Sequence, residues 1–121
     1  MKYLLMIVLL FSSGQARAEQ GEAFYTGNEL LELCEAYLSG DTVAIITIGN
    51  TCIGYVIGIA DAQKIFVNRN LMEQNWCLPE DIKASQLVRV VTKYLQENPQ
   101  ALHLTASSMA ANALQKAFHC E

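Results

Sequence analysis

The sequence predicts a small all-α domain of four to five helices, cross-linked by two disulfides. Three observations support this fold class. Apolar residues recur at helical spacing along most of the chain, an export signal precedes the domain, and the domain keeps all four cysteines, Cys34, Cys52, Cys77 and Cys120. A small exported domain with an even number of cysteines is typical of disulfide-bonded proteins.

The first 18 residues have the three parts of a secretory signal peptide. Lys2 supplies the positive charge, Leu4 to Phe11 form an unbroken apolar run, and Ala16-Arg17-Ala18 is a small-x-small cleavage site. The apolar run is too short to span a bilayer, so we expect cleavage after Ala18 rather than a membrane anchor. The mature domain, residues 19–121, is expected outside the cytoplasm.

Export makes the domain more acidic. Of the eight Lys and Arg residues, Lys2 and Arg17 leave with the signal, whereas all twelve Asp and Glu residues stay, which gives a net charge of about −6. This charge argues against nucleic acid and against an anionic membrane surface, because both attract clustered basic residues. It is compatible with a basic protein partner.

The first helix is expected from about Gly27 to Ser39. Thr26 and Glu29 have capping-box spacing, and Gly40-Asp41 supplies the end. Its apolar residues recur at helical spacing: Leu30, Leu33, Cys34, Tyr37 and Leu38. The next segment, 43–48, is β-branched and is followed by Gly49-Asn50, so a short strand and a helical turn both remain open.

A second helix, about 52–67, is apolar over much of its circumference and is expected to be central. Gly54, Gly58 and Ala62 lie on one side of it. Each glycine costs a helix about 1 kcal/mol relative to alanine, so we expect close packing by a neighbouring backbone in return. The alternative is that the glycines mark a loop. Because one neighbour cannot cover so wide an apolar face, we predict a homodimer.

The remaining chain predicts a loop and a helical hairpin. The loop, 68–76, mixes amides with apolar side chains and is a candidate recognition site. After Cys77-Leu78-Pro79, a third helix should run to about Glu97, and a fourth should start with Asn98 as its cap and Pro99 in its first turn. The residues expected to face inward are Leu87, Val88, Val91, Tyr94 and Leu95 on the third helix, and Leu102, Ala106, Met109, Ala110, Ala113, Leu114 and Ala117 on the fourth.

This order of helices predicts the disulfide pairing. Cys77 and Cys120 lie equally far from the fold of the hairpin at Asn98-Pro99, so they should meet at its open end. Cys34 and Cys52 should likewise be brought together by the short connection between the first two helices. On the chain-entropy model, loops of about 19 and about 44 residues are worth roughly 3 and roughly 4 kcal/mol.

Catalytic or metal chemistry is not indicated. His103, His119, Cys77 and Cys120 could supply four zinc ligands, but they lack zinc-site spacing and an oxidising compartment favours disulfides. The histidines are expected on the surface, and no base is readable beside Ser107-Ser108. We therefore predict a protein that is not an enzyme and needs no cofactor or metal.

Several motifs together resemble one family. They are Thr26-Gly27-Asn28-Glu29-Leu30-Leu31, Cys34, Cys52-Ile53-Gly54-Tyr55-Val56-Ile57-Gly58, Cys77-Leu78-Pro79, Gln86-Leu87-Val88, Tyr94-Leu95, Asn98-Pro99 and Ala113-Leu114-Gln115-Lys116-Ala117-Phe118-His119-Cys120. In this order they are similar to the Rap/Tai immunity proteins of type VI secretion, over essentially the whole mature chain. One departure is His119, where the family usually has proline.

The resemblance implies a periplasmic immunity protein that binds a peptidoglycan-cleaving amidase effector and blocks its active site. Such an inhibitor needs a rigid frame, an apolar anchor and complementary charge. We assign partner binding to the loop residues Asn68, Arg69, Asn70, Leu71, Met72 and Trp76, with Leu71, Met72 and Trp76 as the apolar contacts. For Trp76, covering the core is an equal alternative. A rival function is a periplasmic acid-stress or holdase chaperone, which would expose apolar surface when its carboxylates are neutralised.

Overall fold

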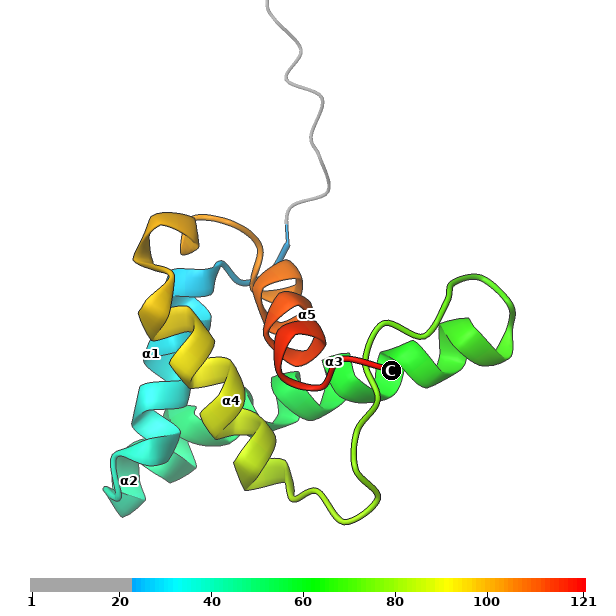
Figure 1. Ribbon diagram of the computed structural model, residues 1–121. Coiled ribbons are helices and arrows are strands. Elements are labelled where there is room, and N and C mark those ends of the chain that lie inside the picture. The colour runs from blue at the N-terminus through cyan, green and yellow to red at the C-terminus, as the bar shows by residue number, and fades with distance from the viewer. Residues whose placement is uncertain (1–22) are drawn as a thin grey trace, which may run out of the picture.

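The computed structural model describes residues 23–121, which form an all-α domain (Figure 1), as the sequence predicts. Its elements are α1 (Gly27–Leu38), α2 (Thr42–Ala44), the π-helical segment η1 (Ile45–Gly49), α3 (Asn50–Asn68), α4 (Ala84–Glu97), the 3-10 turn η2 (Pro99–Ala101) and α5 (Ala106–Ala117). The predicted signal peptide, 1–18, lies outside the described residues.

Helix α1 begins at the capping box that the sequence predicts. The Thr26 hydroxyl accepts a hydrogen bond from the Glu29 N–H at 3.4 Å, and the Glu29 carboxylate accepts one from the Thr26 N–H at 2.7 Å. The carboxylate accepts from the Thr26 N–H and also from the Thr26 hydroxyl at 3.0 Å, and these two bonds favour its ionised form, so they lower the pKa of Glu29. The chain turns after α1 at Gly40, whose φ of +76° suits glycine.

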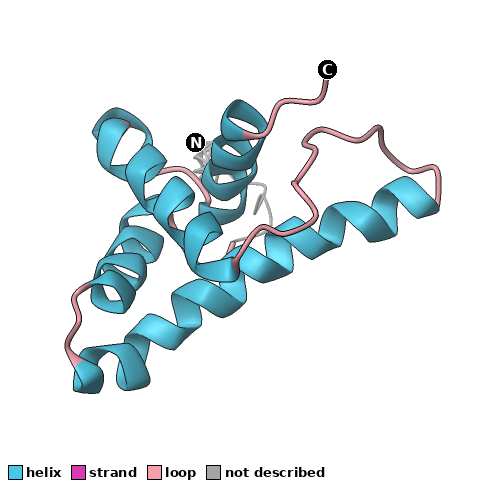
Figure 2. Ribbon diagram, turned by 60° about the horizontal axis from the view of Figure 1, so that its bottom comes forward, coloured by secondary structure: helices cyan, strands magenta, loops and turns pink. Residues whose placement is uncertain are grey.

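Residues Thr42–Asn68 form one continuous helix, which settles the open choice for 43–48 against a strand. Asp41 caps it, because its carboxylate accepts hydrogen bonds from the N–H groups of Val43 at 2.9 Å and Ala44 at 3.5 Å. The backbone of Gly49 keeps helical dihedrals, φ −62° and ψ −35°, so the glycine does not end the element. Figure 2 shows the resulting long helix beneath the others.

The close approach of a neighbouring backbone occurs at Gly49 rather than at Gly54 or Gly58. A Cβ at Gly49 would lie 2.8 Å from the Cα and N atoms of Tyr37 in α1. A Cβ at Gly54 or Gly58 would meet no atom within 4 Å apart from its own turn of helix, and both residues are exposed. The packing role predicted for these two glycines is therefore not found within the described chain. Ala62 is half-buried.

Helices α4 and α5 form the predicted hairpin, but both start later than predicted, at Ala84 and Ala106. The fourth helix cannot run on from Pro99, because the chain before α5 pairs with the segment before α1. The Gly27 N–H donates to the Leu104 carbonyl at 2.8 Å, and the Ala106 N–H donates to the Tyr25 carbonyl at 2.9 Å. Thr105 then caps α5 by accepting from the Ser108 N–H.

The core draws on every long helix and is closed by both predicted disulfides. Cys34–Cys52 joins α1 to α3, and Cys77–Cys120 joins the segment before α4 to the end of the chain. The first bond is fully buried, whereas Cys77 is exposed. The buried apolar residues are Leu30, Cys34, Cys52, Val56, Ala60, Trp76, Leu87, Val88, Val91, Leu95, Leu102, Ala106, Met109, Ala110, Ala113 and Leu114. Ala117, predicted to be buried, is exposed.

Candidate functional site

The second half of α3 extends beyond the other helices and the chain then folds back along it (Figures 1 and 2). We call this projection the arm and define it as residues 61–76, with an outgoing limb, 61–68, and a returning limb, 72–76. All six partner-binding residues predicted from the sequence lie on it: Asn68, Arg69, Asn70, Leu71, Met72 and Trp76. The arm is therefore the candidate functional site.

A Schellman motif turns the chain at the tip of the arm. Asn70 has the left-handed φ of +55°, the conformation that ends many helices. Its N–H donates to the Val67 carbonyl at 3.0 Å, and the Leu71 N–H donates to the Phe66 carbonyl at 2.9 Å. Because both bonds tie the turn to the last turn of α3, the tip has a defined backbone conformation.

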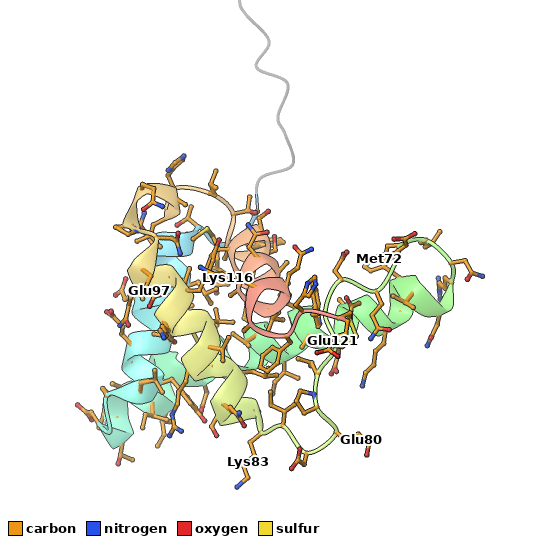
Figure 3. All side chains as sticks on the ribbon, in the orientation of Figure 1. Met72, Glu80, Lys83, Glu97, Lys116 and Glu121 are labelled. Carbon is orange, nitrogen blue, oxygen red and sulfur yellow. A yellow bond between two sulfur atoms is a disulfide. The ribbon has the colours of Figure 1, made fainter. Side chains whose placement is uncertain are left out.

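The tip exposes apolar side chains. Leu71 is 66% exposed and Phe66 is 46% exposed, while Met72 is half-buried. Figure 3 shows Met72 on the returning limb of the arm, away from α4. A compact group of exposed apolar residues on a structured turn has the character of an anchor at a protein interface.

The base of the arm is fixed by a buried glutamine, Gln63. Its side-chain oxygen accepts hydrogen bonds from the N–H groups of Asn75 at 2.7 Å and Trp76 at 3.1 Å, and its amide nitrogen donates to the Trp76 carbonyl at 2.9 Å. The Gln74 amide also donates to this carbonyl, at 3.2 Å. The returning limb is thus bound to the outgoing limb at its base as well as at its tip.

Trp76 does not present its ring to a partner in this structure. Its side chain is 5% exposed and belongs to the core, which agrees with the alternative reading of this residue and not with an exposed apolar contact. The indole N–H is the one buried side-chain polar group in residues 23–121 that lacks a hydrogen-bond partner. Buried donors are normally paired, often with water.

Trp76 lines two hollows. One, of about 280 Å³, lies between the arm and α5, and Phe66, Met72 and Ser107 contribute to its walls. The other, of about 470 Å³, lies on the side of α4, and Asp61, Lys64 and Glu80 line it together with apolar side chains. The first continues the apolar surface of the tip, so the tip and this hollow form one candidate contact surface.

The charges of the arm are exposed and free of short ion pairs with other described residues. Asp61, Lys64, Arg69 and Glu73 all face solvent, and the ion pair found in residues 23–121 lies elsewhere, between Lys93 and Glu97 at 3.8 Å. Arg69 is therefore available to a partner. No group of three or more His, Cys, Asp or Glu side chains in the described part of the chain is placed to hold a metal ion.

The long helix that carries the arm is unusually apolar for its exposure. Thr42–Asn68 is long and apolar enough to cross a membrane by length and composition, with a mean hydropathy of 1.9, and 22% of that apolar stretch is buried. A central helix of a soluble protein can have the same length and composition. Its exposed apolar side chains are Val43, Ile46, Ile48, Ile65 and Phe66.

Sequence reasoning missed two parts of this site. The sequence correctly predicts Phe66 as a helical residue, but only the structure shows that the turn brings it beside Leu71. Gln63 was missed because a lone glutamine in an apolar helix has no distinctive signal. Its position on the buried side, in register with Val56 and Ala60, was the available indication.

These features define a small, disulfide-bonded helical protein with a structured apolar arm, a class suited to binding another protein. A family model described as Rap1a immunity proteins matches residues 26–120, so the chain belongs to this family. No curated protein sequence is significantly similar to the chain. The family indicates immunity to a secreted effector, and it suggests an inhibitor rather than an enzyme.

Proposed function

We propose that this is a periplasmic immunity protein that binds and inhibits a cognate type VI secretion peptidoglycan amidase. The family match supports protection from a secreted effector, and the motif resemblance supports an amidase as that effector. The observation that carries the site assignment is the arm, whose tip exposes Leu71 and Phe66 on a hydrogen-bonded turn. Two disulfides suit an oxidising compartment such as the periplasm.

In this proposal the arm acts by occupying the substrate cleft of the amidase. A wedge that is already ordered loses little conformational entropy on binding, so more of its contact energy appears as affinity. Leu71 and Met72 supply the apolar anchor, and the exposed Arg69 supplies a charge that can pair with an acidic group beside the cleft. Inhibition then requires exclusion of substrate and no chemistry by the immunity protein.

The test is a substitution at the tip with a matched control elsewhere. Leu71→Asp places a charge at the centre of the proposed contact, whereas Leu104→Asp makes the same change at another exposed leucine, 45% exposed, outside the arm. Leu71→Asp should weaken binding to the cognate amidase by more than about 1.4 kcal/mol, a factor of ten, and should abolish protection in cells. Leu104→Asp should do neither.

Met72→Asp provides a second variant at the same surface and should behave like Leu71→Asp. Circular dichroism and the thermal midpoint must stay near those of the wild type for both. If both folded variants still bind and protect, the recognition surface is not the arm. If the wild-type protein instead binds many unfolded clients weakly and no amidase tightly, the holdase alternative is correct.

The long helix also supports the proposed homodimer. Val43, Ile46, Gly54, Gly58 and Ile65 follow one another at intervals of 3, 8, 4 and 7 residues, close to one or two helical turns, and are all exposed, with the two glycines in the middle. In an antiparallel pair of helices whose two-fold axis passes near Gly54, Val43 would face Ile65 of the partner subunit. A second copy would then cover the apolar stripe and use the free space at the glycines. A monomer mass by light scattering at tens of micromolar would contradict this assembly.

A further inference from the structure

Gln63 differs from the other buried polar side chain of the described residues. Thr92 bonds only within its own helix, where its hydroxyl donates to the Val88 carbonyl at 2.7 Å. Gln63 is 6% exposed, and its three hydrogen bonds reach a segment 12 and 13 residues further along the chain. The Thr92 side chain therefore bonds only to its own helix, whereas the Gln63 side chain binds the returning limb of the arm.

The returning limb depends on this amide because no helix or sheet supports it there. Residues 72–79 have no regular secondary structure, so their backbone groups need partners from elsewhere. The carboxamide of Gln63 accepts from two successive N–H groups and donates to the carbonyl of Trp76, much as a neighbouring strand would. One side chain thus satisfies three backbone groups of an irregular segment at the point where Trp76 enters the core.

Packing alone does not explain a glutamine at this position. The residues one and two turns earlier on the same side of α3, Ala60 and Val56, are apolar, and an apolar residue would fill the space without burying an amide. A buried amide is tolerated when its donors and acceptors are paired, which these bonds achieve. The amide is therefore explained by the conformation it imposes on the limb.

We propose that Gln63 is the positioning residue of the recognition surface. By fixing Asn75 and Trp76 it sets where the returning limb leaves the core, and with the Schellman turn at the other end it fixes the direction of Leu71 and Met72. Gln63 itself is buried and does not touch a partner. This inference rests on the proposed function for its effect on effector binding, whereas the effect on the limb is independent of any effector.

The decisive variants differ in which hydrogen bonds they keep. Gln63→Met retains length and approximate volume but none of the three bonds. In Gln63→Glu the ionised carboxylate places an oxygen where the Gln63 amide donates to the Trp76 carbonyl at 2.9 Å, and repulsion between the two oxygens should displace the limb. When the carboxyl is protonated, its O–H can donate to that carbonyl and the bonding pattern of Gln63 is restored. Burial away from water raises the pKa of such a carboxyl, so the protonated form should be reached under mildly acidic conditions. Thr92→Val is the control, because it removes one buried hydrogen bond outside the arm.

The first readout is the limb itself in the free protein. Hydrogen exchange of the Asn75 and Trp76 amides should accelerate at least tenfold in Gln63→Met, with α4 amides unchanged, and should stay at the wild-type rate in Thr92→Val. Trp76 is the single tryptophan, so its fluorescence should also shift to longer wavelength in Gln63→Met only. For Gln63→Glu, each signal is compared with that of the wild type at the same pH. The difference between the two proteins should shrink as the pH falls from about 8 to about 5.

The second readout is affinity for the cognate amidase. Gln63→Met should bind at least tenfold more weakly than the wild type, Thr92→Val should bind normally, and Gln63→Glu should recover affinity at low pH relative to the wild type. If Gln63→Met does not fold, the test is Gln63→Glu alone, whose amide exchange and affinity are compared at high and low pH in one folded protein.

Unchanged exchange at Asn75 and Trp76 in Gln63→Met, or in Gln63→Glu at high pH, would overturn the positioning role whether or not an effector binds. Faster exchange with unchanged affinity would overturn the link between the limb and recognition. If the wild-type protein binds no amidase, but exchange at Asn75 and Trp76 accelerates in Gln63→Met as expected, the proposed function is overturned and the role of Gln63 in the limb stands.

Discussion

Two glycines of the same long helix should respond in opposite directions to the same substitution. Gly54→Ala and Gly49→Ala each add one methyl group to a helical residue, and each gains about 1 kcal/mol of helix stability from the change. At Gly54 the new Cβ meets no atom within 4 Å, so this gain should appear in full. For a domain of this size it corresponds to a rise of roughly 4–8 °C in the thermal midpoint.

At Gly49 the same methyl group meets backbone that cannot rotate away. It would lie 2.8 Å from the Cα and N atoms of Tyr37, and 3.2 Å from the carbonyl carbon of Ala36. Overpacking of this kind costs about 1–3 kcal/mol, and contact with backbone places it at the upper end of that range. We expect a net loss of about 2 kcal/mol, so the two variants should differ by about 3 kcal/mol.

The assay is equilibrium urea unfolding followed by circular dichroism, with Gly58→Ala as a second open position. Protein concentration is kept where light scattering gives one species for every variant, because assembly alters apparent stability. Equal stabilisation by Gly49→Ala and Gly54→Ala would refute the close crossing of α1 and the long helix. Destabilisation by Gly54→Ala with no change in assembly would refute the free space beside Gly54.

Two further predictions concern the disulfides and the tip of the arm. A small dithiol should reduce Cys77–Cys120 well before Cys34–Cys52, because Cys77 is exposed whereas both cysteines of the other pair are 0% exposed. Alkylation and mass spectrometry measure the order of reduction. Simultaneous reduction of the two disulfides would contradict this prediction. Asn70→Ala should destabilise the protein by about 1 kcal/mol because alanine disfavours the left-handed conformation, while Asn70→Gly should be neutral. Equal urea midpoints for these two variants would contradict the Schellman turn.

Local signals determined much of the fold. The Thr26 and Glu29 capping box depends on residues three apart, so the sequence places the start of α1 correctly. Helical periodicity identifies the buried faces of α4 and α5 for the same reason. The disulfide pairing also followed, because antiparallel order and short connections constrain which cysteines can meet.

Helix limits were less predictable where distant segments compete for the backbone. Asn98-Pro99 has the pattern of a helix start, yet only the short turn η2 forms there. Residues 102–106 instead bond to the chain around Gly27, far away in sequence. No local pattern encodes that pairing.

The role of the glycines shows the same division. Glycine in an apolar helix predicts a close contact somewhere, but the crossing point depends on the angle between α1 and the long helix, which tertiary packing sets. The contact therefore falls on Gly49 and leaves Gly54 and Gly58 open.

The sequence by itself determined an all-α, disulfide-bonded chain, its family motifs and the segment of the arm, because these depend on composition, spacing and short-range bonds. Only the tertiary structure decided that Trp76 is buried, that Phe66 joins Leu71 at the tip, and that Gln63 holds the returning limb. Each of these facts depends on which side of a helix or turn faces the core. That orientation results from the packing of segments distant in sequence, so the order of residues alone does not reveal it.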